Sequence, residues 1–329
     1  FMEYCKAMRE GEKCSFYSEL YNKGKTGLSI KGIKTKIDIK QRGVLHVAEV
    51  KKHCISTGVC PYYLTTELAN DARVIIADYN NVFNPSVQKS FFARAGKELE
   101  KSIIIVDEGH NLADRIRAMM SSRLSSFIIK GALQEAKKFG FAEVLGRLND
   151  IQDGLNFLCM KQKERSVTRE EFMKMVSSFT DYDGLIEHLE IIGNKVRAEQ
   201  KRSFLGSVSE FLASWDNESP NFARMIEERD NGVMLHNVCL DAAELSQPVF
   251  DSVYASITMS GTLVPTSMFG NILGINRRVE KVYPSPFPIE NRRTLVVPET
   301  TTKYAMRSDF MYNLIADACA KIINSVPGN

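Results

Sequence analysis

Several features that would define a class of function are missing from these 329 residues. No stretch approaches the roughly 20 consecutive apolar residues that cross a bilayer, so no membrane partner is expected. The seven cysteines are too few and scattered for a disulfide scaffold, and no two have the C-x-x-C spacing of a structural zinc site. The net charge is only +3, so any nucleic-acid surface has to be local. With 44% hydrophobic and 25% charged residues the composition is globular, and the length of 329 residues suggests two or three domains.

A phosphate-binding loop of the form G-x-x-x-x-G-K-[ST] is also absent. Gly24-Lys25-Thr26 matches only the end of that pattern, and Glu19 stands where its first glycine would be. The loop's backbone N–H groups hold the phosphates of a nucleotide. We therefore interpret Gly24-Lys25-Thr26 as a surface turn and expect no nucleotide hydrolysis by this chain alone.

The chain does contain an acidic pair behind a short apolar run. Ile103–Val106 is predicted to be a strand buried on both faces of a parallel sheet. Asp107 and Glu108 follow at its carboxyl end, where open α/β sheets bind ligands. In nucleotide hydrolases the first such acid holds Mg²⁺ and the second orients or deprotonates the attacking water. Many other α/β proteins have a strand ending in Asp-Glu, but His110 completes a D-E-x-H box, which favours a nucleic-acid motor.

Two further strands are predicted. Val253–Met259 is followed by Ser260, Gly261 and Thr262, a small polar turn that resembles the helicase element sensing the state of the nucleotide. Val74–Ala77 is followed by Tyr79 and Asn80, at a strand end where ligand contacts are common.

Four of the cysteines, Cys5, Cys14, Cys54 and Cys60, lie near the amino end. Pro61 follows Cys60, and a Cys-Pro pair is a familiar setting for an iron–sulfur ligand. On spacing alone, zinc and unliganded core thiols remain alternatives. The segment from Lys23 to Lys52 is basic, which fits either a solvated surface or a wall beside a nucleic-acid path.

The order of these elements resembles the XPD family of iron–sulfur DNA helicases. The strings that carry the resemblance are C-P-Y-Y from Cys60, D-E-G-H-N from Asp107, S-G-T from Ser260, and S-P-F-P-x-E-N-R from Ser285. The resemblance implies a superfamily 2 helicase that uses ATP and Mg²⁺ to move 5′ to 3′ on single-stranded DNA. It also implies a 4Fe-4S cluster, with Cys14 and Cys60 as matched ligands and Cys5 as a ligand by position. The first cluster ligand and the phosphate-binding loop are expected before Phe1. Cys54 is a weaker candidate for a cluster ligand than Cys5.

Roles for single residues follow from their chemistry and position, and for His110 from the resemblance. Asp107 would bind Mg²⁺, Glu108 would be the general base, and His110 would link them to Ser260, Gly261 and Thr262. Tyr62 and Tyr63 would stack on DNA bases, with Tyr79 and Asn80 as a second contact. Ordinary packing remains the alternative for the tyrosines, and a structural histidine for His110.

The expected fold is α/β: a RecA-like parallel-sheet motor domain, interrupted by an iron–sulfur insert and an all-helical arch insert, followed by the start of a second RecA-like domain. The expected boundaries are residues 1–66 for the iron–sulfur domain, 67–115 with 242–268 for the first motor, 116–241 for the arch, and 269–329 for the second motor. Amphipathic stripes predict arch helices around Phe172 to Phe179 and Leu185 to Ile192.

Two other functions remain open: a DinG-like iron–sulfur helicase, and a DNA-binding module without enzymatic activity. The chain is expected to be an internal piece of an archaeal-like protein. Its expected role is nucleotide excision repair, with repair-complex proteins as partners. The expected location is cytoplasmic and nucleoid-associated in an archaeon, or nuclear in a eukaryote.

Overall fold

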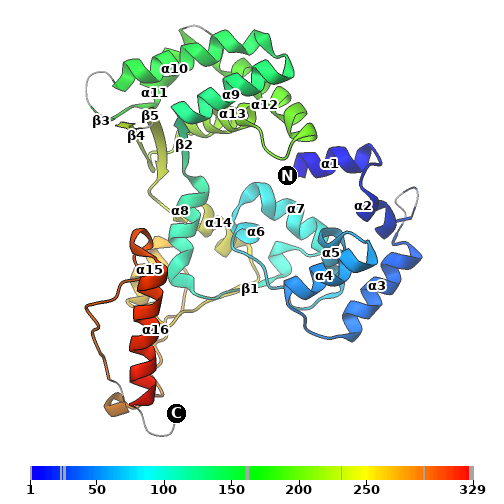
Figure 1. Cartoon of the computed structure of the whole chain (residues 1–329), viewed down its shortest axis with the longest axis vertical. Helices are drawn as coiled ribbons and strands as arrows, with labels where there is room; N and C mark the ends of the chain where they lie inside the picture. Colours follow the sequence, from blue (N-terminus) through cyan, green and yellow to red (C-terminus); the bar gives the residue numbers. More distant parts are fainter. Residues whose placement is uncertain are drawn as a thin grey trace. The chain divides into compact units, whose positions relative to one another are not determined.

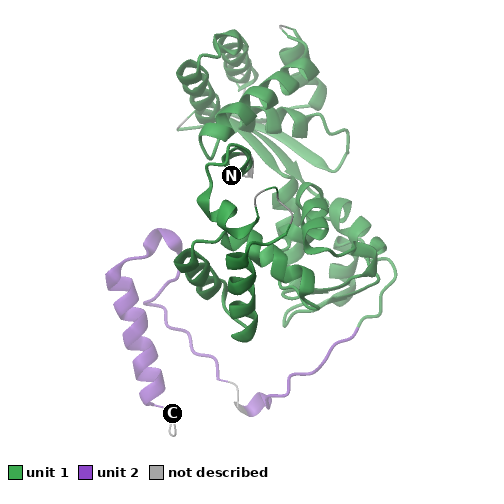
Figure 2. Cartoon of the chain, turned by 90° about the vertical axis from the view of Figure 1, so that its right-hand side faces the viewer, with its two compact units in different colours: residues 1–280 green, residues 281–329 purple. Residues whose placement is uncertain are grey.

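The computed structural model describes residues 2–22, 24, 27–159, 163–178, 180–230, 232–291 and 293–325. They form a mixed α/β chain in which helices predominate, divided into a compact unit of residues 1–280 and another of residues 281–329 (Figure 2). Lys25 and Thr26 of the interpreted surface turn lie outside the described residues, as does Arg292 of the S-P-F-P string.

The first core of the larger unit is built by short helices near the amino end (Figure 1). These helices are α2 (Ser15–Leu20), α3 (Ile30–Gln41), α4 (Val47–Thr57) and α5 (Pro61–Asp71), whereas no described residue of the preceding α1 (Met2–Glu10) belongs to this core. Local signals fix their ends: His46 and Glu49 form a capping box before α4, and Gly58 ends α4 in the left-handed conformation. The buried residues are Leu20, Ile39, Val50, Cys54, Val59 and Leu64.

The second core lies around a two-stranded parallel sheet. Its elements are α6 (Asn80–Phe83), α7 (Pro85–Ala95), β1 (Ile103–Val106), α8 (Leu112–Met120), α14 (Ala243–Ser252), β6 (Ala255–Thr258) and α15 (Thr266–Ile272). Strands β1 and β6 pair in parallel, with Ile103 opposite Ala255 and Val106 opposite Thr258. The predicted strand at 103–106 is therefore present, and the one predicted at 253–259 is present as Ala255–Thr258.

Two expectations about this region are wrong. Strand β1 is buried on one face only: Val106 is inside, whereas Ile103 and Ile105 are about 60% exposed. Residues Val74–Ala77 form no strand, and Val74 and Ile76 are exposed. The cause is the same for both, since a short apolar run becomes a buried strand only where other strands and helices flank it.

The third and largest core covers residues 124–235. Its helices are α9 (Ser126–Phe139), α10 (Leu145–Cys159), α11 (Arg169–Ser177), α12 (Tyr182–Glu199) and α13 (Phe204–Trp215). Its strands are β2 (Ser122–Ser125), β3 (Glu164–Ser166), β4 (Phe222–Arg229) and β5 (Gly232–Cys239), which form an antiparallel sheet in the order β2-β5-β4-β3. The expected all-helical insert is therefore wrong. Strand β5 buries every second residue, a pattern that a helix cannot give.

The predicted helical stripes of this region are confirmed, except that Phe179 lies outside the described residues. Phe172 and Val176 of α11 and Leu185 and Leu189 of α12 are fully buried. A Cβ on Gly193 of α12 would stand 2.7 Å from the Gly206 backbone, so α12 and α13 cross where neither has a side chain.

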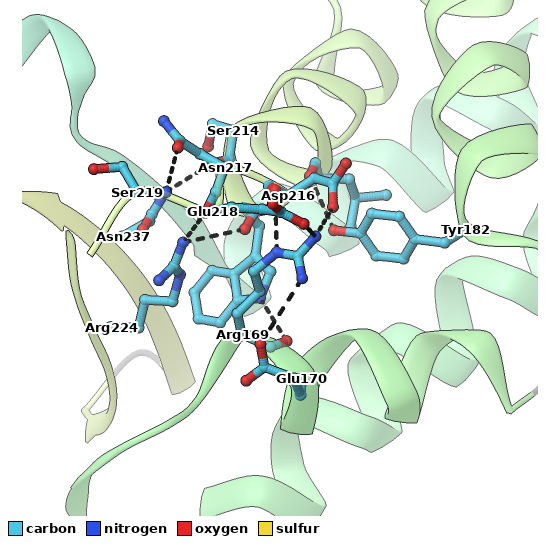
Figure 3. Close-up of polar contacts among 12 residues, drawn as sticks. Arg169, Glu170, Tyr182, Ser214, Asp216, Asn217, Glu218, Ser219, Arg224 and Asn237 are labelled. Carbon is cyan, nitrogen blue, oxygen red and sulfur yellow. Dashed lines mark hydrogen bonds and ion pairs between the residues drawn. The ribbon is translucent and has the colours of Figure 1, made fainter. Parts of the chain in front are cut away.

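Polar contacts connect α11 and the end of α13 to strand β4 of the antiparallel sheet (Figure 3). Arg169 donates from Nε to the Asp216 carbonyl at 3.0 Å and pairs with its carboxylate at 2.5 Å. The indole of Trp215 donates back to the Arg169 carbonyl at 3.2 Å, and the Arg224 guanidinium of β4 lies over the Trp215 ring. Hydrogen bonds and a cation–π contact thus connect α11, the end of α13 and strand β4.

The smaller unit consists of extended backbone, short 3-10 turns at Ile289–Asn291 and Tyr304–Met306, and helix α16 (Asp309–Asn324). Ser308 caps α16 by accepting a hydrogen bond from the Met311 amide. Throughout the described ranges, no helix combines the length and apolar character needed to cross a membrane.

Candidate functional site

The two predicted motifs meet at the carboxyl ends of β1 and β6. The Met259 amide donates to the Val106 carbonyl at 2.9 Å, and the Gly109 amide then donates to the Met259 carbonyl at 2.9 Å. These bonds extend the parallel ladder by one step past each strand. As a result, Asp107 to His110 face Ser260 to Thr262 across the sheet edge.

The acidic pair is held in an unusual backbone conformation. Glu108 has φ 49° and ψ 42°, the left-handed region that non-glycine residues rarely occupy. The Asp107 carboxylate accepts the Glu108 amide at 2.9 Å. Both acids are exposed, with 61% of the Glu108 side chain accessible. The pair is therefore open to a ligand, and its backbone is of the kind that clusters at functional sites.

Four side chains at this edge form what we call the acid–histidine–serine cluster: Glu108, His110, Ser260 and Thr262. His110 Nδ1 lies 2.6 Å from Ser260 Oγ and 3.2 Å from Glu108 Oε2. Ser260 Oγ also donates to Glu108 Oε2 at 3.2 Å and lies 3.4 Å from Thr262 Oγ1. Gly261 leaves its surroundings open, because a Cβ there would meet nothing within 4 Å. The sequence-predicted residues are thus in direct contact.

Position 109 has to be a glycine because the acidic segment after β1 lies very close to the end of β6. A Cβ at this position would stand 2.3 Å from Thr258 Cγ2. Any larger residue would push the acidic segment away from β6.

Tyr79 reaches the same edge from a loop before α6. Its hydroxyl donates to the carbonyl oxygens of Asp107 and, at 3.2 Å, of Glu108. Burial, and then the carboxylates of Asp107 and Glu108, raise the pKa of Tyr79, so it stays a donor at neutral pH. Tyr79 also lines a pocket of about 610 Å³, together with Ala77, Asp78, Asn80, Asn111, Arg115, Ala118 and Met119.

Cys14 and Cys60 occupy equivalent places, each preceding the first turn of a helix, α2 and α5. The Cys60 amide donates to the Phe16 carbonyl at 2.9 Å, which joins the two helix starts. Burial raises the pKa of the Cys60 thiol, and the thiols of Cys14 and Cys5 raise it further. Two cysteines at the starts of joined helices are chemically suitable donors for an iron–sulfur cluster, which binds them as thiolates.

Within the part of the chain that the structure describes, no three His, Cys, Asp or Glu residues are arranged to hold a metal ion. Cys54 is fully buried in the first core, where burial and then Cys60 raise its pKa to about 11.

Tyr62 and Tyr63 have different surroundings. Tyr63 lies edge-on to Tyr17 at 5.0 Å, and the Arg9 guanidinium stands 5.1 Å from its ring. Tyr62 is 44% exposed and touches Arg94 of α7, which donates to its hydroxyl and lies over its ring. Tyr62 is therefore accessible for stacking, whereas Tyr63 is mostly packed.

A sequence model of the DEAD_2 family matches residues 1–129. That segment contains the candidate cluster ligands Cys5, Cys14 and Cys60, the candidate DNA-binding tyrosines and the acidic pair. Over these residues the chain is similar to DEAD_2 proteins.

Individual relatives agree with this assignment. The chain is similar to the general transcription and DNA repair factor IIH helicase subunit XPD/RAD3 of Saccharomyces cerevisiae, with 20% identity over 91% of this chain and 46% of the yeast protein. It is also similar to a regulator of telomere elongation helicase 1 homolog of Anopheles gambiae, with 28% identity over 40% of this chain and 12% of that protein. The resemblance to XPD/Rad3-type helicases is therefore confirmed, and the chain spans less than half of each of these two relatives.

A solved structure of S. tokodaii Xpd4 is similar over 98% of this chain and 67% of that one, with 16% identity and a TM-score of 0.42. This TM-score indicates only a weak similarity of fold. The fold of the chain is defined by its own hydrogen-bonded helices and strands.

Sequence reasoning missed Arg9 and Arg94 in this DEAD_2 segment. Arg94 is 32 positions from Tyr62, and neither arginine belongs to a motif. No local signal could have found them. The basic segment is partly neutralised, because Lys31 pairs with Glu19 at 2.9 Å and Lys36 with Asp71 at 3.0 Å.

Proposed function

We propose that the protein to which this chain belongs is an ATP-dependent DNA helicase that moves 5′ to 3′ on single-stranded DNA, with a role in nucleotide excision repair. The observation that carries the proposal is the contact of Glu108 and His110 with Ser260, at 3.2 and 2.6 Å. It joins an exposed acidic pair to a second strand end, as a motor needs if hydrolysis is to be coupled to movement. The DEAD_2 match and the yeast relative, whose name includes DNA repair, support the same reading.

The roles of the residues follow from their positions. Asp107 would hold Mg²⁺, and Glu108 would orient the attacking water and accept its proton. His110 and Ser260 touch the same Glu108 oxygen, so a change at this carboxylate reaches the β6 turn through hydrogen bonds. Gly261 would let that turn approach the nucleotide, and Thr262 would complete the coupling.

The expected domains are part of the proposal. Three separate hydrophobic cores support an iron–sulfur domain at 1–66, a first motor at 67–115 and 242–268, and an arch at 116–241. A RecA-like motor would require further strands beside β1 and β6. Residues 269–329 would begin a second motor, although the compact units separate after residue 280.

A 4Fe-4S cluster would be held by Cys5, Cys14, Cys60 and a fourth thiolate. When bound, it would cross-link the helices of the first core and order them beside the DNA path. Tyr62 would stack on a base, and Arg94 next to it would contact the phosphate. Tyr63, Tyr79 and Asn80 complete the proposed DNA contacts.

The test is Glu108→Gln in the protein that carries the phosphate-binding loop together with this chain. ATP should still bind, while hydrolysis stimulated by single-stranded DNA should fall by about 10² to 10⁴. The matched control is Glu98→Gln, which removes an exposed carboxylate paired with Lys101 and should have no effect. Retention of hydrolysis by the Glu108 variant would mean that another residue activates the water, and a wild-type protein that hydrolyses no ATP would leave a DNA-binding module as the better account.

A further inference from the structure

Tyr79 is bonded to the backbone of the acidic pair rather than to either carboxylate. Its hydroxyl donates to the carbonyl oxygens of Asp107 and Glu108, two consecutive peptide groups. The peptide planes on both sides of the Glu108 Cα are therefore held by one side chain. Because these planes set φ and ψ, the contact acts directly on the left-handed conformation of Glu108.

That conformation decides where the Glu108 carboxylate lies. With φ 49° the side chain projects toward Ser260 Oγ and His110 Nδ1, which both lie 3.2 Å from its Oε2 atom. A return of Glu108 to an ordinary negative φ would swing the Cβ to a different direction and break both contacts. Left-handed backbone is strained for a non-glycine residue, so it persists only where surrounding contacts enforce it.

We infer that Tyr79 is a positioning residue for Glu108: its hydroxyl holds the acidic pair in the backbone conformation that brings the Glu108 carboxylate to Ser260 and His110. This inference rests on the proposed function, since it concerns the carboxylate proposed as the general base. The hydroxyl of Tyr79 is then engaged with the acidic pair, so the DNA contact proposed for Tyr79 would be made by its ring.

The ring and the hydroxyl of Tyr79 have separable roles. The ring is partly buried against the second core, where phenylalanine would fill the same space. Only the hydroxyl reaches the two carbonyl groups. Tyr79→Phe therefore removes the contact with Glu108 while keeping the packing, and the variant is expected to fold.

The first measurement uses the 329-residue chain and needs no enzymatic activity. In Tyr79→Phe, amide hydrogen exchange should become about tenfold faster in the peptide spanning residues 107–111, where the Gly109 and Asn111 amides are hydrogen-bonded. A tenfold change corresponds to about 1.4 kcal/mol, the size of one hydrogen bond. Exchange in β4 and β5 and the melting temperature should stay unchanged. Tyr254→Phe, an exposed tyrosine next to β6, is the matched control.

The second measurement separates positioning from binding in the protein with the phosphate-binding loop. Tyr79→Phe should lower kcat for ATP hydrolysis about tenfold with KM for ATP unchanged. Unchanged exchange at residues 107–111, or faster exchange with unchanged kcat, would overturn the inference. Failure of the proposed function is recognised separately, because Glu108→Gln would then retain hydrolysis whatever Tyr79→Phe does.

Discussion

Replacing Gly109 by alanine tests the closeness of the two motifs. The new Cβ would stand 2.3 Å from Thr258 Cγ2, whereas real Cβ atoms do not approach other heavy atoms closer than 3.0 Å, so the segments have to separate by at least about 0.7 Å. If all of that displacement fell on the contact of His110 with Ser260, it would lengthen from 2.6 Å to about 3.3 Å, near the limit of a hydrogen bond. We expect overpacking to cost about 1–3 kcal/mol.

The matched control is Gly261→Ala, in the facing turn. A Cβ there meets nothing within 4 Å and the backbone is not left-handed, so this variant should be neutral or more stable by about 0.4–1 kcal/mol. Because both variants restrict the unfolded chain equally, the difference between them isolates the steric cost. Native-state hydrogen exchange of residues 103–111 measures this difference locally. Equal exchange in the two variants would refute the reasoning, since it would mean that β6 does not lie against Gly109.

Three further changes address other parts of the chain. Arg94→Gln should weaken binding of single-stranded DNA and reduce the slope of log K against log salt by about 0.7, the value for one lost phosphate contact, whereas Lys89→Gln on the same helix should not. Where all four ligands are supplied, Cys60→Ala should abolish iron content and absorbance at roughly 400 nm, whereas Cys54→Ala should retain both. A hydrogen bond from His236 holds the pKa of Glu227 below its usual 4.5. Its stabilisation is therefore present above that pH and lost as the pH falls below it, so Glu227→Gln should reduce the loss of thermal stability between about pH 5 and 3.

The antiparallel sheet shows where sequence reasoning was insufficient. The hairpin of β4 and β5 has a local signal that could have been used, because Asp230-Asn231-Gly232 separates two segments and β5 alternates buried and exposed residues. Strands β2 and β3 have no such signal. They are three or four residues long, and each is defined by its partner, β5 or β4, far away in the chain. Short strands of this kind form because a neighbour offers hydrogen bonds.

The two apolar runs show a second limit of sequence reasoning, which is that it predicts strands that do not form. Ile103–Val106 and Val74–Ala77 look alike in sequence, yet only the first is a strand. Strand β1 has β6 beside it, whereas Val74 and Ile76 remain exposed. Composition predicts which segments can be strands, but pairing decides which of them are.

The sequence by itself determined the chemistry of the candidate site: an acidic pair, a histidine and a serine-containing turn, each directly after an apolar run. Local propensity and the order of motifs were enough for that, because those signals lie within a few residues of one another. Only the tertiary structure decided that Glu108 takes a left-handed backbone, that Tyr79 holds it there, and that Arg94 lies against Tyr62. These features depend on contacts between residues about 30 positions apart, and such contacts exist only once the chain has packed.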